Sequence, residues 1–168
     1  DRIACYAGGV RLYPNGYEVD APAIGTSGDP PHGPELADYL LAFRRKPEWF
    51  YGSGVPTCAL LARRDVFREM GGFDPKLRRL SDVDFAIRLA LAGGYFVGTP
   101  ERLYTRHMTQ AAYKSAEAIR DARLSLVEKH IDYLKSIGRD EYARRWTMMR
   151  YWHFKRRYDR LAQELVGL

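Results

Sequence analysis

The sequence is poor in cysteine, and the two cysteines stand far apart. Cys5 and Cys58 are separated by 53 positions, which is neither the close spacing of a zinc site nor the density of a disulfide framework. Both lie in apolar, strand-like surroundings, so we expect two buried free thiols rather than a bridge. Free thiols are typical of a reducing compartment, which favours a cytoplasmic location.

Long apolar runs are also missing. No stretch of about 18 or more apolar residues occurs, so we expect no transmembrane helix. The first residues, Asp1 to Ile3, include neither a starting methionine nor a basic segment followed by an apolar one, so no signal peptide is expected either. So abrupt a beginning suggests a piece of a longer protein.

Acidic residues are fewer than basic ones, and the difference is concentrated in one part of the chain. The 168 residues include 27 Lys and Arg against 21 Asp and Glu, which gives a net charge of +6. Between residues 111 and 168 there are 13 basic and 8 acidic residues, a difference of +5. Such a tail can bind phosphates, an anionic membrane or nucleic acid, or it can be the solvated face of helices.

The apolar residues that are present suffice for one domain with a real core, since 46% of the chain is hydrophobic. Within 2–13, hydrophobic spacing predicts a strand, a bend or bulge at Gly8-Gly9 and a second short strand. It predicts further strands over 58–62, 95–98 and 103–107. Helices are predicted over 35–45, 64–70 and 82–92, and two more amphipathic helices follow Met108, separated near 136–138. The sequence therefore predicts a mixed α/β domain over 1–110, with a helical tail over 111–168 packed on it.

Two carboxylates open the predicted helix 82–92. Asp82 and Asp84 lie where backbone N–H groups and the helix dipole stabilise anions. Many such pairs are helix caps. The functional alternative is that one carboxylate accepts a proton from an attacking hydroxyl.

A histidine follows the last strand-like segment, in the pair Arg106-His107. Neutral imidazole suits Mn²⁺ or Zn²⁺, and carboxylates suit Mg²⁺ and Mn²⁺. A lone histidine is more often a surface or satisfied core residue, and that default applies to His32, His130 and His153. We expect His107 and Asp82 to face a common cleft.

The segment Gly52-Ser53-Gly54 allows the backbone to approach a ligand closely. Trp49, just before it, is either a stacking surface for a sugar ring or a core residue. Neither feature is specific by itself.

Five short motifs occur in a fixed order: GSG at 52–54, LLARRDVF at 60–67, GGFD at 71–74, SDVDF at 81–85 and YTRH at 104–107. In this order and spacing, residues 50–110 resemble the second half of a family 2 glycosyltransferase. The resemblance implies part of a GT-A fold, with a mixed sheet. It also implies inverting transfer of a sugar from a nucleotide-diphosphate donor to a hydroxyl of a glycan, lipid or small-molecule acceptor.

The resemblance also implies roles for individual residues. Asp82 would be the catalytic base, and Asp84 would support it. His107 would help to hold a divalent cation, Mn²⁺ or Mg²⁺, that neutralises the departing diphosphate. The substrate-binding residues would be Trp49, Gly52, Ser53, Gly54 and Arg106.

The chain departs from that family in two places. Ser81 stands where the family usually has glutamate, which leaves the base intact and changes its surroundings. No equivalent of the family's Asp-x-Asp motif, which grips metal and diphosphate, precedes Gly52. The chain therefore resembles an enzyme without its N-terminal half.

Two other readings remain open. One is a non-catalytic module that binds a nucleotide or glycan. The other is a tail that binds an anionic membrane peripherally or binds nucleic acid, through Arg144, Arg145, Lys155, Arg156, Arg157 and Arg160 interleaved with Trp146, Tyr151, Trp152 and Tyr158. Helical spacing of Tyr142, Trp146 and Met149 favours packing against the core over nucleic-acid binding.

Overall fold

The computed structural model describes residues 2–109 and 115–166. Contacts divide the chain into two compact units, the first formed by 1–74 with 81–110 and the second by 75–80 with 111–168. Sequence patterns do not reveal that the short segment 75–80 belongs to the second unit. The fold is mixed α/β, as predicted.

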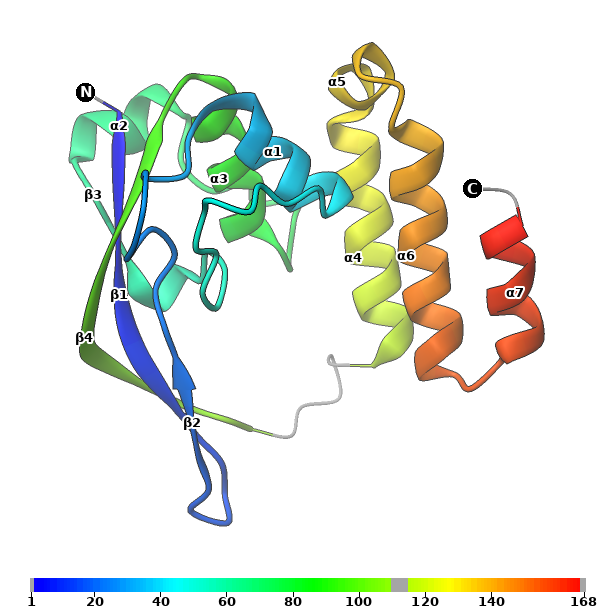
Figure 1. The fold of residues 1–168 in the computed structure, drawn as a ribbon, viewed down its shortest axis with the longest axis horizontal. Coiled ribbons are helices and arrows are strands. Elements are labelled where there is room, and N and C mark those ends of the chain that lie inside the picture. The colour runs from blue at the N-terminus through cyan, green and yellow to red at the C-terminus, as the bar shows by residue number, and fades with distance from the viewer. Residues whose placement is uncertain (1, 110–114, 167–168) are drawn as a thin grey trace. The chain divides into compact units, whose positions relative to one another are not determined.

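The sheet of the first unit is built around one long central strand, β1 (Ile3–Leu12). Strands β2 (Glu18–Ala21) and β3 (Leu60–Ala62) pair with β1 antiparallel, at opposite ends of it. Strand β4 (Tyr95–His107) runs parallel to β1 along its other edge, as Figure 1 shows. The sheet is therefore mixed.

Glycines explain an irregularity in the middle of the sheet. The register between β1 and β4 shifts on both sides of Gly8. A Cβ at Gly8 would stand 2.9 Å from the carbonyl oxygen of Glu101, so only glycine allows β4 to lie this close. The predicted bulge is confirmed, but the two strands predicted on either side of it are one strand, β1. The two strands predicted at 95–98 and 103–107 are likewise one strand, β4.

Helices α1 (Gly33–Ala42) and α3 (Ser81–Leu91) contact each other and lie on one face of the sheet (Figure 1). Alternate residues of β1 point to this face, because side chains of a strand alternate. The core residues of the first unit include Ala4, Tyr6, Val10, Leu36, Leu40, Phe85, Leu89 and Phe96. Burying each large apolar side chain contributes about 1.5–3 kcal/mol.

Two short helical elements flank β3 in the sequence. The 3-10 turn η1 (Thr57–Ala59) leads into β3, where a single strand over 58–62 was predicted. Helix α2 (Arg64–Glu69) follows β3 and ends at the glycine pair Gly71-Gly72, as predicted.

The second unit is helical. It contains α4 (Ala116–Lys129), α5 (Ile131–Ser136), α6 (Asp140–Phe154) and α7 (Tyr158–Val166). The break predicted near 136–138 is present, and two further breaks, at His130 and at 155–157, divide each of the two expected helices. Leu126, Leu134 and Ala143 form the buried centre of this unit.

Both cysteines are free, as predicted, but they are exposed rather than buried. Cys5 lies on the face of β1 opposite to Tyr6, and apolar neighbours in the sequence do not reveal which face a strand residue takes. Within residues 2–109 and 115–166, no helix is long and apolar enough to cross a membrane.

Candidate functional site

Asp82 lies in the first turn of α3, where two backbone N–H groups hold its carboxylate. Its Oδ1 accepts a hydrogen bond of 2.9 Å from the amide of Val83, and its Oδ2 accepts one of 3.3 Å from the amide of Thr57. The side chain is half-buried. Each carboxylate oxygen can accept more than one hydrogen bond, so both retain room for a substrate hydroxyl.

Thr57 connects Asp82 with the glycine loop at 52–54. Gly54 is three residues before Thr57, and three residues of chain span at most about 11 Å. Gly54 has a φ of 85°, and a Cβ built there would meet nothing within 4 Å. The loop therefore presents open backbone at Gly54 in the neighbourhood of Asp82.

Gly52 is packed closely against the backbone of residues 22–23, unlike Gly54. Its φ is 49°, and a Cβ there would stand 2.3 Å from the carbonyl oxygen of Pro22 and 2.5 Å from that of Ala23. The amide of Ser53 donates a hydrogen bond of 2.8 Å to the Pro22 oxygen. Gly52 and Ser53 thus hold the loop against residues 22–23. Gly54 is the residue of the loop whose Cα has space around it.

Side chains from β1, β4 and η1 come together around Tyr104. The ring of Tyr104 covers Gly9, where a Cβ would stand 2.5 Å from the ring atom Cε1. Burial, with the neighbouring Cys58 thiol, raises the pKa of Tyr104, and the charges of Arg11 and Arg106 oppose that rise. Tyr104 therefore lies near the thiol of Cys58 and the guanidinium groups of Arg11 and Arg106.

Those two guanidinium groups come from adjacent strands, because Arg11 of β1 and Arg106 of β4 are paired in register. Two like charges side by side at the carboxyl ends of parallel strands attract an anion. Ligands of open α/β sheets bind at the carboxyl ends of the strands. Arg106 thus lies where a substrate phosphate could be held.

Tyr6 is a buried phenol in electrostatic reach of Asp82. Its side chain is 2% exposed, and its hydroxyl has no hydrogen-bond partner among the described residues. Burial raises the pKa of Tyr6 far above its ordinary value, and the negative charge of Asp82 adds to the rise. The ring stacks on Phe96, with centroids 6.0 Å apart.

Asp84 is separated from this neighbourhood by burial. It is fully buried, and the Nε of Arg88 donates to its Oδ2 over 2.9 Å. Arg88 also donates to the carbonyl oxygens of Gly72, at 2.7 Å, and Met70. Asp84 thereby orients an arginine that binds the end of α2, and its supporting role in catalysis stays a prediction.

Trp49 is 6% exposed, so the structure places it in the core, one of the two roles left open for it. Its ring lies 5.5 Å from that of His32 and 6.2 Å from that of Tyr51. The Nζ of Lys46 lies 4.7 Å from the centroid of the indole. Little of the indole is left for a sugar ring to stack on.

His107 is the exposed last residue of β4, paired with Leu12 of β1. It lies three strand residues beyond Tyr104, which is about 10 Å along β4. Asp82 is bound to Thr57 of η1. A common cleft for Asp82 and His107 stays a prediction.

The described residues do not by themselves fit a divalent cation. In residues 2–109 and 115–166, no group of three or more His, Cys, Asp or Glu side chains could hold a metal ion. Mg²⁺ and Mn²⁺ require several oxygen ligands, and His107 supplies one nitrogen. We therefore derive no step through a metal.

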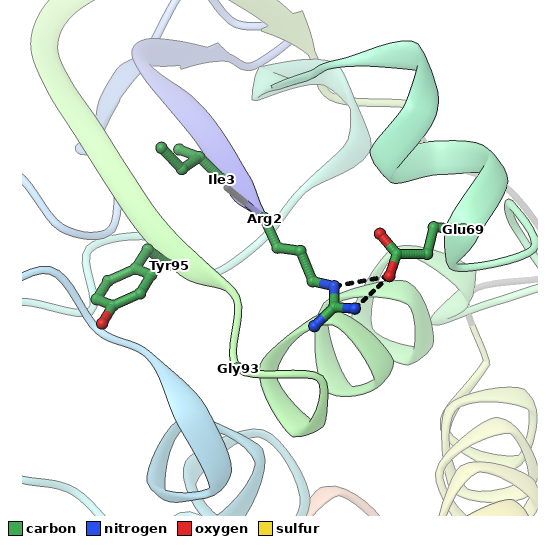
Figure 2. A pocket seen from close by; sticks show the side chains of 5 residues that line it. All are labelled: Arg2, Ile3, Glu69, Gly93 and Tyr95. Carbon is green, nitrogen blue, oxygen red and sulfur yellow. Dashed lines mark hydrogen bonds and ion pairs between the residues drawn. The ribbon is translucent and has the colours of Figure 1, made fainter.

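A pocket of about 620 Å³ opens at the other end of the sheet, and Figure 2 shows the residues that line it. The guanidinium of Arg2 pairs there with Glu69 and donates to the carbonyl oxygen of Ala92 over 2.7 Å. Ile3 and Tyr95 mark the amino ends of the parallel strands. The pocket is about 20 Å along β1 from Gly9, so it is not part of the Asp82 site.

The sequence predicts roles for Asp82, Gly54 and Arg106, but it assigns none to Tyr6, Thr57, Cys58 and Tyr104. Strand alternation in 2–13 is a signal that Tyr6 faces the core. No sequence signal reveals that η1 lies between α3 and β4. Comparison with family models, curated proteins and solved structures found no match to this chain, so functional assignment rests on the residues and their geometry.

Proposed function

We propose that this chain is the acceptor-side part of an inverting glycosyltransferase with a GT-A type of fold, and that Asp82 is its catalytic base. One observation carries the proposal. The carboxylate of Asp82 is oriented by the amides of Val83 and Thr57, and Thr57 follows the open backbone of Gly54 by three residues. An acceptor hydroxyl bound at this loop would find a positioned proton acceptor.

The chemistry of such a step balances without a further reactant. Asp82 takes the proton of the acceptor hydroxyl, and the oxygen forms a bond to the anomeric carbon of the donor sugar. The bond from that carbon to the nucleotide diphosphate breaks, and its electron pair leaves with the diphosphate. Attack from the face opposite to the leaving group inverts the anomeric configuration.

The departing diphosphate requires positive charge. Arg106 and Arg11, which are paired on adjacent strands, would supply it. Arginine binds phosphate oxygens through two parallel hydrogen bonds, which adds orientation to charge. The donor would thus lie toward the carboxyl ends of β1 and β4, with the acceptor toward Asp82. A cytoplasmic nucleotide-sugar pool is the source that we expect for the donor.

The test uses the complete protein that contains this chain. It is incubated with a panel of nucleotide-diphosphate sugars and glycan, lipid and small-molecule acceptors, and release of nucleoside diphosphate is measured. We expect Asp82→Asn to lower turnover at least about 100-fold, the usual range for loss of a general base. Donor affinity should be nearly unchanged.

Asp65→Asn is the matched control. Asp65 also lies in the first turn of a helix, and its Oδ1 accepts from the next amide, that of Val66, at 3.0 Å. Its turnover should equal that of the wild type. Transfer at a near wild-type rate by Asp82→Asn would refute the base assignment.

A non-catalytic module that binds a nucleotide or glycan is the alternative. It predicts that the complete wild-type protein binds a nucleotide sugar and releases no diphosphate with any acceptor. Binding that is lost on Arg106→Ala while turnover is absent throughout would favour this reading.

A further inference from the structure

Helix α7 is amphipathic but buries none of its described residues. Tyr158, Leu161 and Leu165 recur at steps of three and four, so they form one stripe along the helix. Only Leu161 of this stripe is half-buried, while Tyr158 is 60% and Leu165 50% exposed. Val166, at the end of the helix, is 90% exposed.

The exposed stripe continues onto α6. A groove of about 360 Å³ lies between the two helices, and it is lined by Trp146, Met149, Arg150, His153, Phe154 and Leu161. Phe154, at the end of α6, is 57% exposed. The α6–α7 hairpin therefore displays a largely apolar surface from the groove to Val166.

The turn of this hairpin is strongly basic. Residues 154–158 read Phe-Lys-Arg-Arg-Tyr, and we call this segment the hairpin tip. Between residues 144 and 160 there are seven basic residues and one acidic residue, Asp159. The excess of +6 over this stretch equals the net charge of the whole chain.

Two of the basic side chains in the hairpin tip form exposed ion pairs, which another anion can replace. Lys155 pairs with Glu117 at 2.9 Å, and Arg157 pairs with Asp159 at 2.8 Å. All four side chains are about half exposed, and ion pairs in water contribute little to stability. Lipid phosphates can therefore compete for these cations.

We propose that the hairpin tip and the apolar stripe of α7 dock on the surface of an anionic lipid bilayer. The cations of residues 155–157 contact lipid headgroups, and Phe154 and Tyr158 insert at the level where aromatic rings prefer to lie. Leu165 and Val166 favour a bilayer over nucleic acid, because aliphatic side chains gain from acyl chains and offer no ring for a base to stack on. The inference is independent of sugar transfer.

The test is flotation of the whole chain with vesicles. The anionic vesicles contain phosphatidylcholine with about 30 mol% phosphatidylglycerol. The neutral vesicles contain phosphatidylcholine alone. We expect binding to the anionic vesicles, at least about tenfold weaker binding to the neutral ones, and a loss of affinity with added salt.

Charge reversal separates the hairpin tip from general electrostatics. Arg156→Glu with Arg157→Glu should weaken vesicle binding at least about tenfold. The matched control reverses two exposed arginines of α2, Arg64→Glu with Arg68→Glu, and changes the net charge by the same amount. The control should bind as the wild type does.

Two pairs of aromatic variants test whether Phe154 and Tyr158 insert into the bilayer. The tryptophan pair also controls for misfolding. Phe154→Ser with Tyr158→Ser should lose binding, and Phe154→Trp with Tyr158→Trp should keep or strengthen it. Binding to a single-stranded RNA of about 20 nucleotides is measured in parallel, to compare nucleic acid with lipid. Tight, salt-sensitive RNA binding without vesicle binding, equal loss in both charge-reversal pairs, or no binding to anionic vesicles at all would each overturn the proposal.

Discussion

Arg88 donates to Asp84 within α3, and the same guanidinium reaches the carbonyl oxygens of Met70 and Gly72 at the end of α2. One ion pair thus connects the helix that carries the candidate base with the glycine turn before it. Asp82 and Asp84 are two residues apart, and the helix turns them to different surroundings. Asp82 accepts a hydrogen bond from Thr57 of η1, and Asp84 is fully buried.

Asp84 should matter for stability far more than Asp82. We expect Asp84→Ala to lower the free energy of unfolding by about 3–5 kcal/mol, because it leaves the partly buried Arg88 unpaired. Urea denaturation followed by circular dichroism measures the change. The double variant Asp84→Ala with Arg88→Met should recover part of the loss, since neither charge is left alone.

Asp65→Ala serves as the comparison, because the pair of Asp65 with Arg63 is exposed. Its cost should stay below about 1 kcal/mol. If Asp84→Ala were as mild as Asp65→Ala, the buried pair would not have the role described.

The two glycines of the 52–54 loop should respond differently to alanine. Both have positive φ, which costs a residue with a Cβ about 1–2 kcal/mol. Gly54→Ala should cost only this, since its Cβ would stand in open space. Gly52→Ala should cost clearly more, because its Cβ would collide with the backbone of residues 22–23. Thermal unfolding of both variants is the measurement, and equal losses would contradict the assignment.

Tyr6 should make the protein sensitive to alkali. Its pKa is raised in the folded state, so above about pH 10 the unfolded chain loses a proton that the folded one keeps. Stability should then fall by about 1.4 kcal/mol for each pH unit from this group alone. Tyr6→Phe should remove that slope, as measured by urea unfolding between pH 9 and 11.

Tyr6→Phe also removes a buried hydroxyl that has no partner among the described residues. At pH 7 the variant should therefore be as stable as the wild type or up to about 1 kcal/mol more stable. Tyr17→Phe, at a position 63% exposed, is the control and should keep the wild-type alkaline loss. Marked destabilisation of Tyr6→Phe at pH 7 would show that the hydroxyl has a partner.

The second unit should show a small sensitivity to acid, because the Lys155–Glu117 pair is exposed and water screens it. A hydrogen bond from Lys155 lowers the pKa of Glu117 from near 4.5 to about 2. A lowered pKa stabilises the fold above the ordinary value, and this contribution is lost as the pH falls from 4.5 toward 2. Glu117→Gln should reduce the acid loss in thermal melts between about pH 6 and 2, and Lys155→Met should reduce it in part, since a backbone amide and the Tyr151 hydroxyl also lower the pKa of Glu117. An unchanged acid profile in both variants would refute the coupling.

Much of the fold is predictable because it depends on local patterns. Spacing of apolar residues predicts α2 and α3 nearly to the residue, and the glycine pair at 8–9 marks the bulge. The parallel pairing of β1 with β4 is not predictable in this way, since nothing local connects strands so far apart. Burial is hard for a similar reason: Trp49 and Cys5 lie in similar apolar stretches, yet one is in the core and the other is exposed.

The candidate site is predictable only in part. A carboxylate at a helix start and a glycine loop are visible in the sequence, so Asp82 and Gly54 could be named. The phenols of Tyr6 and Tyr104 reach this neighbourhood from strands, and η1 brings Thr57 to Asp82. These contacts depend on tertiary packing, and no short sequence motif encodes them.

The pairing of Ile3 with Tyr95 joins residues 92 positions apart. The central strand of the sheet therefore stays without its parallel neighbour until nearly the whole first unit has left the ribosome. Contacts so distant in sequence slow folding, whereas the neighbouring helices of the second unit close over short loops. During synthesis, the nascent strand β1 would expose its apolar face for several seconds, at about 5–20 residues per second. This interval makes the first unit the part of the chain that most needs a chaperone.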